Sequence, residues 1–448
     1  YGAQDVYLTG NPQITFWKVT YRRHTNFAME SIEQTFNGQA DFGRRVNCTI
    51  SRNGDLAYRT YLQVTLPEIG QSLGGGAGDG TNDVYARWLD FPGHQLVETV
   101  EVEVGGQRIE KQYGDWMHIW CQLTMSSEQE RGYNKMVGNT TQLTFVTDPD
   151  FANVDGPCDS DAPRQVCAPR NALPETTLYV PLQFWFCSNP GLALPLIALQ
   201  YHEVKINLDF RAIDECLWAV KSMTAATADQ KVSGAYAQSL VSASLYVDYV
   251  YLDTDERRRM AQNPHEYLIE QLQHTGAESV GSSSNKVRLN FNHPVKELVW
   301  VVQPDCHVDY CSSTNATGTL YKTLGAQPFN YTDAVDALPN SIKAFGAHVD
   351  AGQFISGNQF ETAAAASIAG DNVVSGDVTA WGGYGAATAA GVSDAGTFVL
   401  AESSLDMHCW GENPVVTAKL QLNGQDRFSE REGSYFDVVK PYQHHTRA

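Results

Sequence analysis

Residues 97–109 read VETVEVEVGGQRI, and this stretch indicates what kind of structure the chain forms. From Val100 to Val104 valine and glutamate alternate strictly, and two glycines follow. Such alternation places the valines on one face of a strand and the glutamates on the other, and paired glycines suit a tight turn. The stretch therefore predicts a β-hairpin with one face in a core and one face in water.

Glu101 and Glu103 of this hairpin are also a candidate catalytic pair, because two carboxylates can divide general acid and base roles. They lie two residues apart on one strand, opposite a row of valines. The period of the strand places them together on its solvent-exposed side. We interpret them as surface residues.

Runs typical of strands continue on both sides of the hairpin. The first half has them at residues 28–36, 46–50, 59–66, 178–186, 203–210 and 239–252, which with the hairpin gives about the eight strands of a jelly roll. Two short helices are predicted at residues 115–123 and 127–136. Trp116 and Trp120 recur at helical spacing in the first, which favours a helix face packed on a sheet over a sugar-stacking platform.

Residues 253–262 (DTDERRRMAQ) switch to helix-forming residues, with Asp253 as a candidate N-cap and Pro264 as a stop. We place the domain boundary here: an N-terminal jelly roll with its arm at 1–255, a linker helix at 256–264 and a C-terminal jelly roll at 265–448. The three arginines 257–259 are expected to be neutralised by nearby carboxylates and not to bind nucleic acid.

The second half repeats the pattern of the first. Strands are predicted at residues 266–272, 286–291, 297–302, 398–405 and 415–422, and residues 70–83 and 363–396 are expected to be long exposed loops. The predicted fold is all-β: two consecutive antiparallel jelly-roll sandwiches with short helices in their loops.

Composition excludes several classes of function. With 448 residues and a net charge of -20, the chain as a whole repels a phosphate backbone, so direct nucleic-acid binding is not expected. Nine scattered cysteines indicate reduced, mostly buried thiols, and no run of residues is apolar and long enough to span a membrane. The sequence has none of the common catalytic motifs, and we expect no catalytic residues and no cofactor.

The sequence contains residues typical of two further kinds of site, a metal site and sites of N-glycosylation. Cys306, His307, Asp309 and Cys311 are metal-ligand types, but a strand would send the first two to opposite faces and no second pair completes a tetrahedron, so no metal is expected. Sequons for N-glycosylation occur at Asn47, Asn139, Asn315 and Asn330. The last three lie in loop-like surroundings and are the better candidate acceptors.

Four segments carry a resemblance to a known family. They are residues 2–27 (GAQDVYLTGNPQITFWKVTYRRHTNF), 114–120 (GDWMHIW), 245–271 (LYVDYVYLDTDERRRMAQNPHEYLIEQ) and 430–446 (EREGSYFDVVKPYQHHT). In this order they resemble the major capsid proteins of nucleocytoplasmic large DNA viruses, such as the algal viruses, iridoviruses and marseilleviruses. The resemblance covers both halves of the chain.

The resemblance implies a structural subunit of two jelly rolls that forms a homotrimeric, pseudo-hexagonal capsomer in an icosahedral shell. It implies neighbouring capsomers and minor capsid and penton proteins as partners, assembly in the host cytoplasm, and a shell that surrounds an internal membrane. Since members of that family continue beyond the PYQHHT-like segment, it also implies that this chain lacks the last part of its second jelly roll.

Three residues of the N-terminal arm are our candidates for assembly contacts: Arg22, Arg23 and His24. We expect the two arginines to hold the arm by pairing with acidic neighbours or by contacting the next subunit. The alternative function is a double jelly-roll hydrolase that processes glycans, or a carbohydrate-binding protein, because the chain offers carboxylates and tryptophans.

Overall fold

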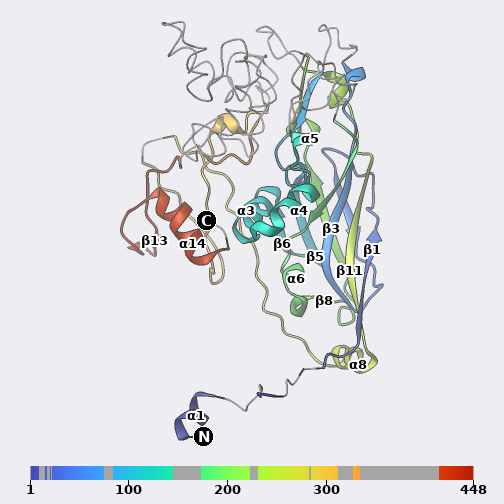
Figure 1. The fold of residues 1–448 in the computed structure, drawn as a ribbon, viewed down its shortest axis with the longest axis vertical. Coiled ribbons are helices and arrows are strands. Elements are labelled where there is room, and N and C mark those ends of the chain that lie inside the picture. Colours follow the sequence, from blue (N-terminus) through green and yellow to red (C-terminus); the bar gives the residue numbers. More distant parts are fainter. Residues whose placement is uncertain are drawn as a thin grey trace.

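The first half of the chain forms a sandwich of two antiparallel sheets (Figure 1). The computed structural model describes residues 2–9, 16–17, 21, 23–74, 84–144, 173–221, 231–281, 284–310, 326–332 and 413–446. One sheet has the order β1-β11-β3-β7, with β8 also paired to β3. Its strands are β1 (Phe27–Gln34), β11 (Ser242–Leu252), β3 (Leu56–Leu66), β7 (Thr176–Pro181) and β8 (Leu194–Pro195).

The second sheet has the order β2-β9-β5-β6. Its strands are β2 (Arg45–Thr49), β9 (Val204–Phe210), β5 (Val97–Val104) and β6 (Gln107–Tyr113). A separate pair, β4 (Tyr85–Trp88) with β10 (Leu217–Val220), extends the sandwich. The predicted hairpin is confirmed as β5 and β6, joined at Gly105 and Gly106, both of which have positive φ.

One continuous core fills the space between the two sheets. Alternate residues of each strand point into it, as the period of two requires. From β11 these are Leu245, Val247 and Tyr249, and from β5 they are Val100 and Val102, all at most 1% exposed. Burial of such side chains is worth about 1.5–3 kcal/mol each, so this core is what holds the two sheets together.

The helices are short and lie outside the sheets. They are α1 (Ala3–Leu8), α2 (Pro92–Leu96), α3 (Gly114–Thr124), α4 (Ser127–Val137), α5 (Thr141–Thr144), α6 (Trp185–Ser188), α7 (Ser233–Tyr236), α8 (Thr254–Gln262) and α14 (Lys440–His444). Single 3-10 turns occur at Gln71–Leu73, Pro190–Leu192, Ile213–Glu215 and Asp305–His307, and a π-helix at Tyr435–Val439. No described helix is long and apolar enough to cross a membrane.

The helix predicted at the domain boundary is confirmed as α8. Asp253 is its N-cap, and its side chain accepts a hydrogen bond from the backbone N–H of Thr254. Of the three arginines 257–259, Arg257 pairs with Asp55 at 2.9 Å, which confirms the expected neutralisation for this residue. Figure 1 shows α8 at the lower end of the sandwich, from which an extended chain returns upward.

The second half differs from the individual strand predictions. Residues 266–272, 286–291 and 297–302 form no ladder with any described strand, so these three strand predictions are wrong for the described chain. An extended run forms a strand only where a second run pairs with its backbone groups, and the strand predicted at 398–405 lies outside the described residues. Residues 415–422 do not form the single strand predicted there. Within this stretch, β12 (Thr417–Ala418) pairs with β15 (Arg431–Glu432), and β13 (Gln421–Leu422) pairs with β14 (Gln425–Asp426).

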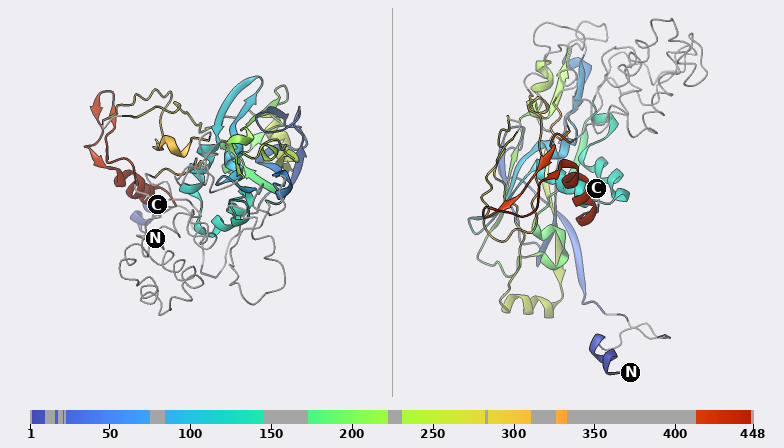
Figure 2. Two further views of the ribbon diagram at one scale, coloured as in Figure 1. Left: turned by 90° about the horizontal axis from the view of Figure 1, so that it is seen from above. Right: turned by 90° about the vertical axis from the view of Figure 1, so that its left-hand side faces the viewer.

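The C-terminal elements lie beside α3 and α4 (Figure 2). The returning chain also contacts the four-stranded sheet, since Gln271 Nε2 donates to the carbonyl oxygen of Ile109 on β6 at 2.7 Å. All described ladders are antiparallel and all helices are short, which confirms the all-β fold class. The predicted loop at 363–396 lies outside the described residues.

Candidate assembly surfaces

The two halves of the chain meet at a buried aromatic cluster that we call the joint: Phe91, His94, His118, Tyr133 and Phe329. The ring of His118 lies 4.4 Å from that of Phe91 and 4.3 Å from that of Phe329, between centroids. Phe329 comes from the second half, and its side chain is almost completely buried. The joint therefore fixes residues 326–332 against the helices of the first half.

Local backbone geometry brings the two histidines together. Phe91 has a left-handed φ of 51° and turns the chain into α2. Gly114 opens α3, and a Cβ at this position would lie 2.2 Å from the carbonyl oxygen of His94. Only glycine allows α3 to start this close to α2. As a result the rings of His94 and His118 lie 5.8 Å apart.

Both histidines are neutral. His94 Nε2 and the hydroxyl of Tyr133 share a hydrogen bond of 2.6 Å, and no described group bonds either Nδ1 atom. Burial lowers the pKa of His94 to about 3. Burial, and to a smaller extent His94, hold the pKa of His118 well below its usual value. A proton on either ring would be a charge in an apolar site, so the joint tolerates only the neutral forms.

A second contact between the halves lies next to the joint. Gln95 Nε2 donates to the hydroxyl of Tyr310 at 3.0 Å. Residues 305–310 are in turn tied to 326–332, because Gln327 N–H donates to His307 O at 2.7 Å and His307 Nδ1 donates to Asn330 O at 3.0 Å. His307 is thus a buried structural residue, held through Nδ1, while no described group bonds its Nε2. No group of three metal-ligand side chains occurs in the described parts of the chain.

Two of the three predicted glycosylation acceptors lie in the part of the chain that the structure describes. Asn139 and Asn330 are both buried, and Asn330 Nδ2 donates to Gln327 Oε1 at 2.7 Å. Both side chains are therefore shielded from solvent in the folded chain. Asn315 lies outside the described residues. Among the sequons in described residues, Asn47 on β2 is the exposed one, and its Oδ1 accepts a hydrogen bond from Asn37 Nδ2 at 2.9 Å.

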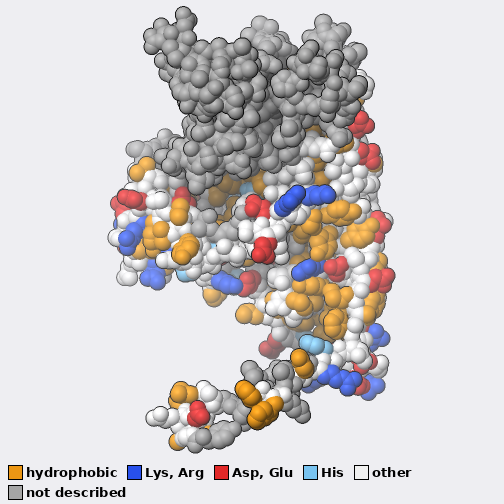
Figure 3. All heavy atoms as spheres, viewed as in Figure 1, with side chains coloured by type: hydrophobic (Ala, Val, Ile, Leu, Met, Phe, Trp, Pro, Cys, Tyr) orange, Lys and Arg blue, Asp and Glu red, His pale blue; other side chains and the backbone are white. Residues whose placement is uncertain are grey.

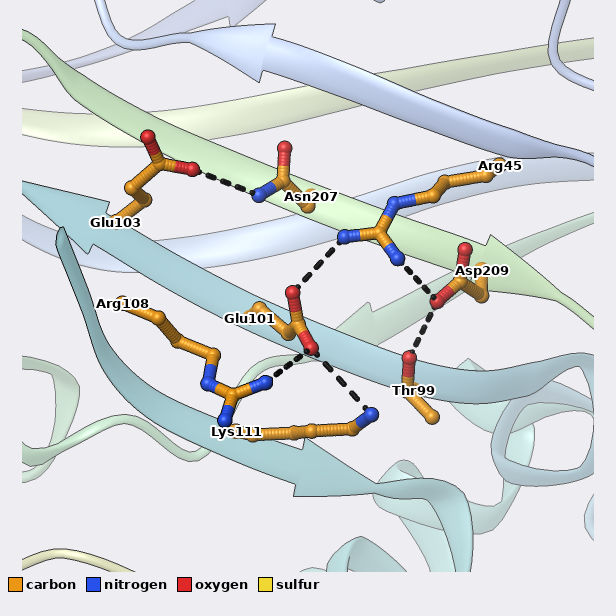
Figure 4. Close-up of polar contacts among 8 residues, drawn as sticks. All are labelled: Arg45, Thr99, Glu101, Glu103, Arg108, Lys111, Asn207 and Asp209. Atoms are coloured by element: carbon orange, nitrogen blue, oxygen red, sulfur yellow. Dashed lines mark hydrogen bonds and ion pairs between the residues drawn. The ribbon is translucent and has the colours of Figure 1, made fainter. Parts of the chain in front are cut away.

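The outer face of the four-stranded sheet carries a charged network (Figure 4). Glu101 lies at its centre, with Arg45 Nη2 at 2.9 Å, Arg108 Nη1 at 3.3 Å and Lys111 Nζ at 3.3 Å from its carboxylate oxygens. Asp209 accepts from Thr99 at 2.6 Å and pairs with Arg45 at 3.5 Å.

This network corrects the prediction that Glu101 lies in water. The strand does place it on the outer face, but it is only 6% exposed, because the long cationic side chains cover it. Its burial favours the protonated form, yet Lys111, Arg45 and Arg108 outweigh this and lower the pKa of Glu101. Glu101 is therefore a neutralised structural anion, not a general acid or base.

The tryptophans of α3 do not form the predicted packing face. The buried residues of that helix are Gly114, Met117, His118 and Cys121. Trp116 and Trp120 are half-buried, and their rings stack with centroids 5.4 Å apart. The ring of His445 lies in a T-shaped arrangement with that of Trp120, with centroids 6.1 Å apart. The two rings therefore pack against each other and beside the C-terminal segment.

Two of the three candidate assembly residues, Arg23 and His24, lie at the base of the arm. Arg22 lies outside the described residues, while Arg23 and His24 are exposed, and neither makes an ion pair with another described residue. The next residue does contact the body, since Thr25 Oγ1 donates to Glu256 Oε1 on α8 at 2.6 Å. Sequence reasoning missed this anchor because 231 residues separate its two partners.

These features describe a β-sandwich subunit in which the buried ionisable groups discussed above, all in the described part of the chain, are neutral or paired. Two family models match the chain. Residues 15–253 match the model described as major capsid protein N-terminus, and residues 256–448 match the model described as large eukaryotic DNA virus major capsid protein. The chain belongs to the major capsid proteins of large eukaryotic DNA viruses.

Individual relatives agree over the full length of the chain. The major capsid protein of Phaeocystis pouchetii virus is 73% identical over 100% of this chain and 84% of its own length. That of Chrysochromulina ericina virus is 66% identical over 100% and 86%. The solved capsid of PBCV-1 is 30% identical, with a TM-score of 0.57 over 96% of this chain and 77% of that chain.

The comparisons confirm the fold class, which is that of the double jelly-roll capsid proteins, and the structural role. The chain is a capsid protein of the virion and not an enzyme, because its families and relatives are structural major capsid proteins. It follows that it assembles with other capsid subunits.

Proposed function

We propose that the chain forms a homotrimer of pseudo-hexagonal outline, and that these capsomers tile an icosahedral shell. The observation that carries this proposal is the joint, which couples the first half of the chain to residues 326–332 of the second through buried rings. With each half of the chain taken as one jelly roll, three chains around a threefold axis present six similar walls to their neighbours. Near-hexagonal packing follows from that number of walls.

The domain division that we propose has the N-terminal jelly roll at 1–255, a linker at 256–264 and the C-terminal jelly roll at 265–448. It is supported by α8 and by its position at one end of the sandwich (Figure 1). In this arrangement the partners of a capsomer are neighbouring capsomers and minor capsid and penton proteins. Assembly takes place in the host cytoplasm, and the shell encloses an internal membrane.

Size-exclusion chromatography with light scattering tests the trimer. We expect a species of three times the mass of the chain, which is 49.4 kDa. A protein that stays monomeric at every concentration up to that of a crowded capsid would refute the homotrimer.

We propose that Arg22, Arg23 and His24 contact the next subunit. The exposed position of Arg23 and His24, without an ion pair to the described body, supports this choice over pairing within the chain. Replacing Arg22 and Arg23 by Glu should leave the unfolding midpoint nearly unchanged, since surface charges contribute about 0–1 kcal/mol. Shell formation, followed by electron microscopy, should be impaired. Normal shells from the double variant would refute the role.

A further inference from the structure

The N-terminal arm comprises residues 2–26, and its described parts, residues 2–9, 16–17, 21 and 23–26, expose apolar side chains that the body of the same chain does not cover. Val6, Tyr7 and Leu8 of α1, together with Phe16, Trp17 and Tyr21, are 69–93% exposed. No residue of α1 is buried. Exposure of this many large apolar groups in one short segment is typical of a surface that binds a partner.

The arm is attached to its own body at its base alone, as far as the described residues extend. The contact is the hydrogen bond from Thr25 to Glu256. Beyond it, α1 bonds within itself, and Phe16 packs edge-on against Trp17 at 5.1 Å. Figures 1 and 2 show α1 below the sandwich and clear of it, and Figure 3 shows the hydrophobic side chains of the arm standing away from the body.

Charge favours a second copy of this chain as the partner. Residues 1–26 contain Lys18, Arg22 and Arg23 against one carboxylate, Asp5, whereas the whole chain has a net charge of -20. The arm is thus basic and the remainder is more acidic than the whole. Opposite charge on two surfaces speeds and orients their association.

The first strand offers a matching acceptor. β1 pairs with β11 on one side and with no described strand on the other, so an open edge faces outward. Phe27 and Met29 on this strand are more than half exposed, and they lie opposite Leu252 and Val250 of β11. An apolar strand face at an open sheet edge is a surface on which an apolar segment from another chain can dock.

We propose that the arm is exchanged between copies: α1 and the Phe16–Trp17 pair of one copy bind the outer face and edge of β1 in another. Each copy then supplies one arm and one acceptor, which is the arrangement that a closed ring of identical subunits requires. This inference rests on the proposed self-assembly and names the contact that stabilises it.

Photo-crosslinking tests the exchange in the full chain. A benzophenone amino acid replaces Trp17, and the labelled copies are mixed with tagged unlabelled copies before irradiation. We expect crosslinks between copies, with mass spectrometry mapping the acceptor to Phe27–Gln34 or Ser242–Leu252. The matched control places the same group at Tyr201, a body residue that is 92% exposed, and should yield at most one tenth as much of that product.

Three outcomes would overturn the inference: crosslinks within one chain only, crosslinks to other surfaces of the second copy, or, with phosphatidylserine vesicles present, crosslinks to lipid in place of protein. A variant with Val6, Tyr7, Leu8, Phe16 and Trp17 all replaced by Ser provides a second measurement. We expect at least tenfold weaker self-association and an unchanged melting temperature of the body. If this variant forms the trimer as well as the unmodified chain does, the arm exchange is refuted but the proposed trimer is not. If the unmodified chain itself is monomeric, the proposed trimer is refuted.

Discussion

Two buried histidines and one buried glutamate make the stability of this protein depend on pH in opposite directions. His94 and His118 have pKa values below the usual 6.5, so the folded chain binds fewer protons than the unfolded chain in mildly acidic solution. Stability that is complete above pH 6.5 is therefore lost as the pH falls towards 3. Because the two rings lie in the joint, acidification acts on the contact between the halves.

Replacing His118 by Phe should reduce this acid sensitivity. The ring is fully buried, so each histidine that stays neutral contributes a slope of about 1.4 kcal/mol per pH unit below 6.5. In urea titrations at pH 7, 6 and 5, the unfolding free energy of the variant should therefore fall less steeply with decreasing pH, by about 1.4 kcal/mol per pH unit. An equal pH dependence in both proteins would show that His118 is not held neutral.

Glu110 on β6 makes the stability of the protein depend on pH in the opposite direction. Burial raises its pKa to about 7, although Gln112 and two backbone N–H groups partly offset this. The folded chain therefore holds a proton that the unfolded chain releases, and stability falls as the pH rises from 4.5 towards 7. Glu110→Gln should stabilise the protein by about 1–3 kcal/mol at pH 8 and leave it unchanged at pH 4. Equal unfolding free energies at pH 8 would contradict this assignment.

At the scale of elements, alternation predicts a strand well when one face of it is buried. Glu101 and its valine neighbours placed β5 correctly, but alternation does not reveal that Arg45 and Arg108 would cover the outer face. β10 was missed because all four of its residues are buried and show no alternation. The joint was missed as well, since Phe91 and Phe329 are far apart in the sequence and no local period links them.

The strands expected in the second half fail for a different reason. A run such as residues 297–302 has the composition of a strand, yet a ladder depends on a second strand whose position the run itself does not specify. In the described chain this region is extended and contacts the first half through side chains, for example Gln271 with Ile109. Composition therefore predicted an extended backbone but not its pairing.

Removing the ring of Phe329 should weaken the joint. Loss of a buried phenylalanine costs about 3–5 kcal/mol in a well-packed core, and less where the site can collapse. We expect Phe329→Ala to lower the unfolding free energy by about 2–4 kcal/mol and to speed hydrogen exchange in residues 326–332. Tyr201→Ala, at an exposed position, is the control and should change neither. Unchanged exchange in the Phe329 variant would mean that the joint does not hold the halves together.

At the scale of the whole molecule, specific residues and not composition predicted the family. Charge, cysteine content and strand pattern predict an acidic, two-domain, all-β protein, but they do not indicate its family. The residues 2–27 and 245–271 gave the capsid resemblance, and the family models now cover both halves. Contacts between copies left no periodic pattern in the sequence, and only the exposed apolar side chains of the folded arm pointed to one.

We propose above that copies of this chain assemble with one another into a shell. Electron microscopy of the purified oligomer tests this self-assembly most directly. Class averages should show particles with threefold symmetry and a six-sided outline, built from two sandwiches per chain. Particles with twofold symmetry, or single bodies with one sandwich each, would contradict the claim.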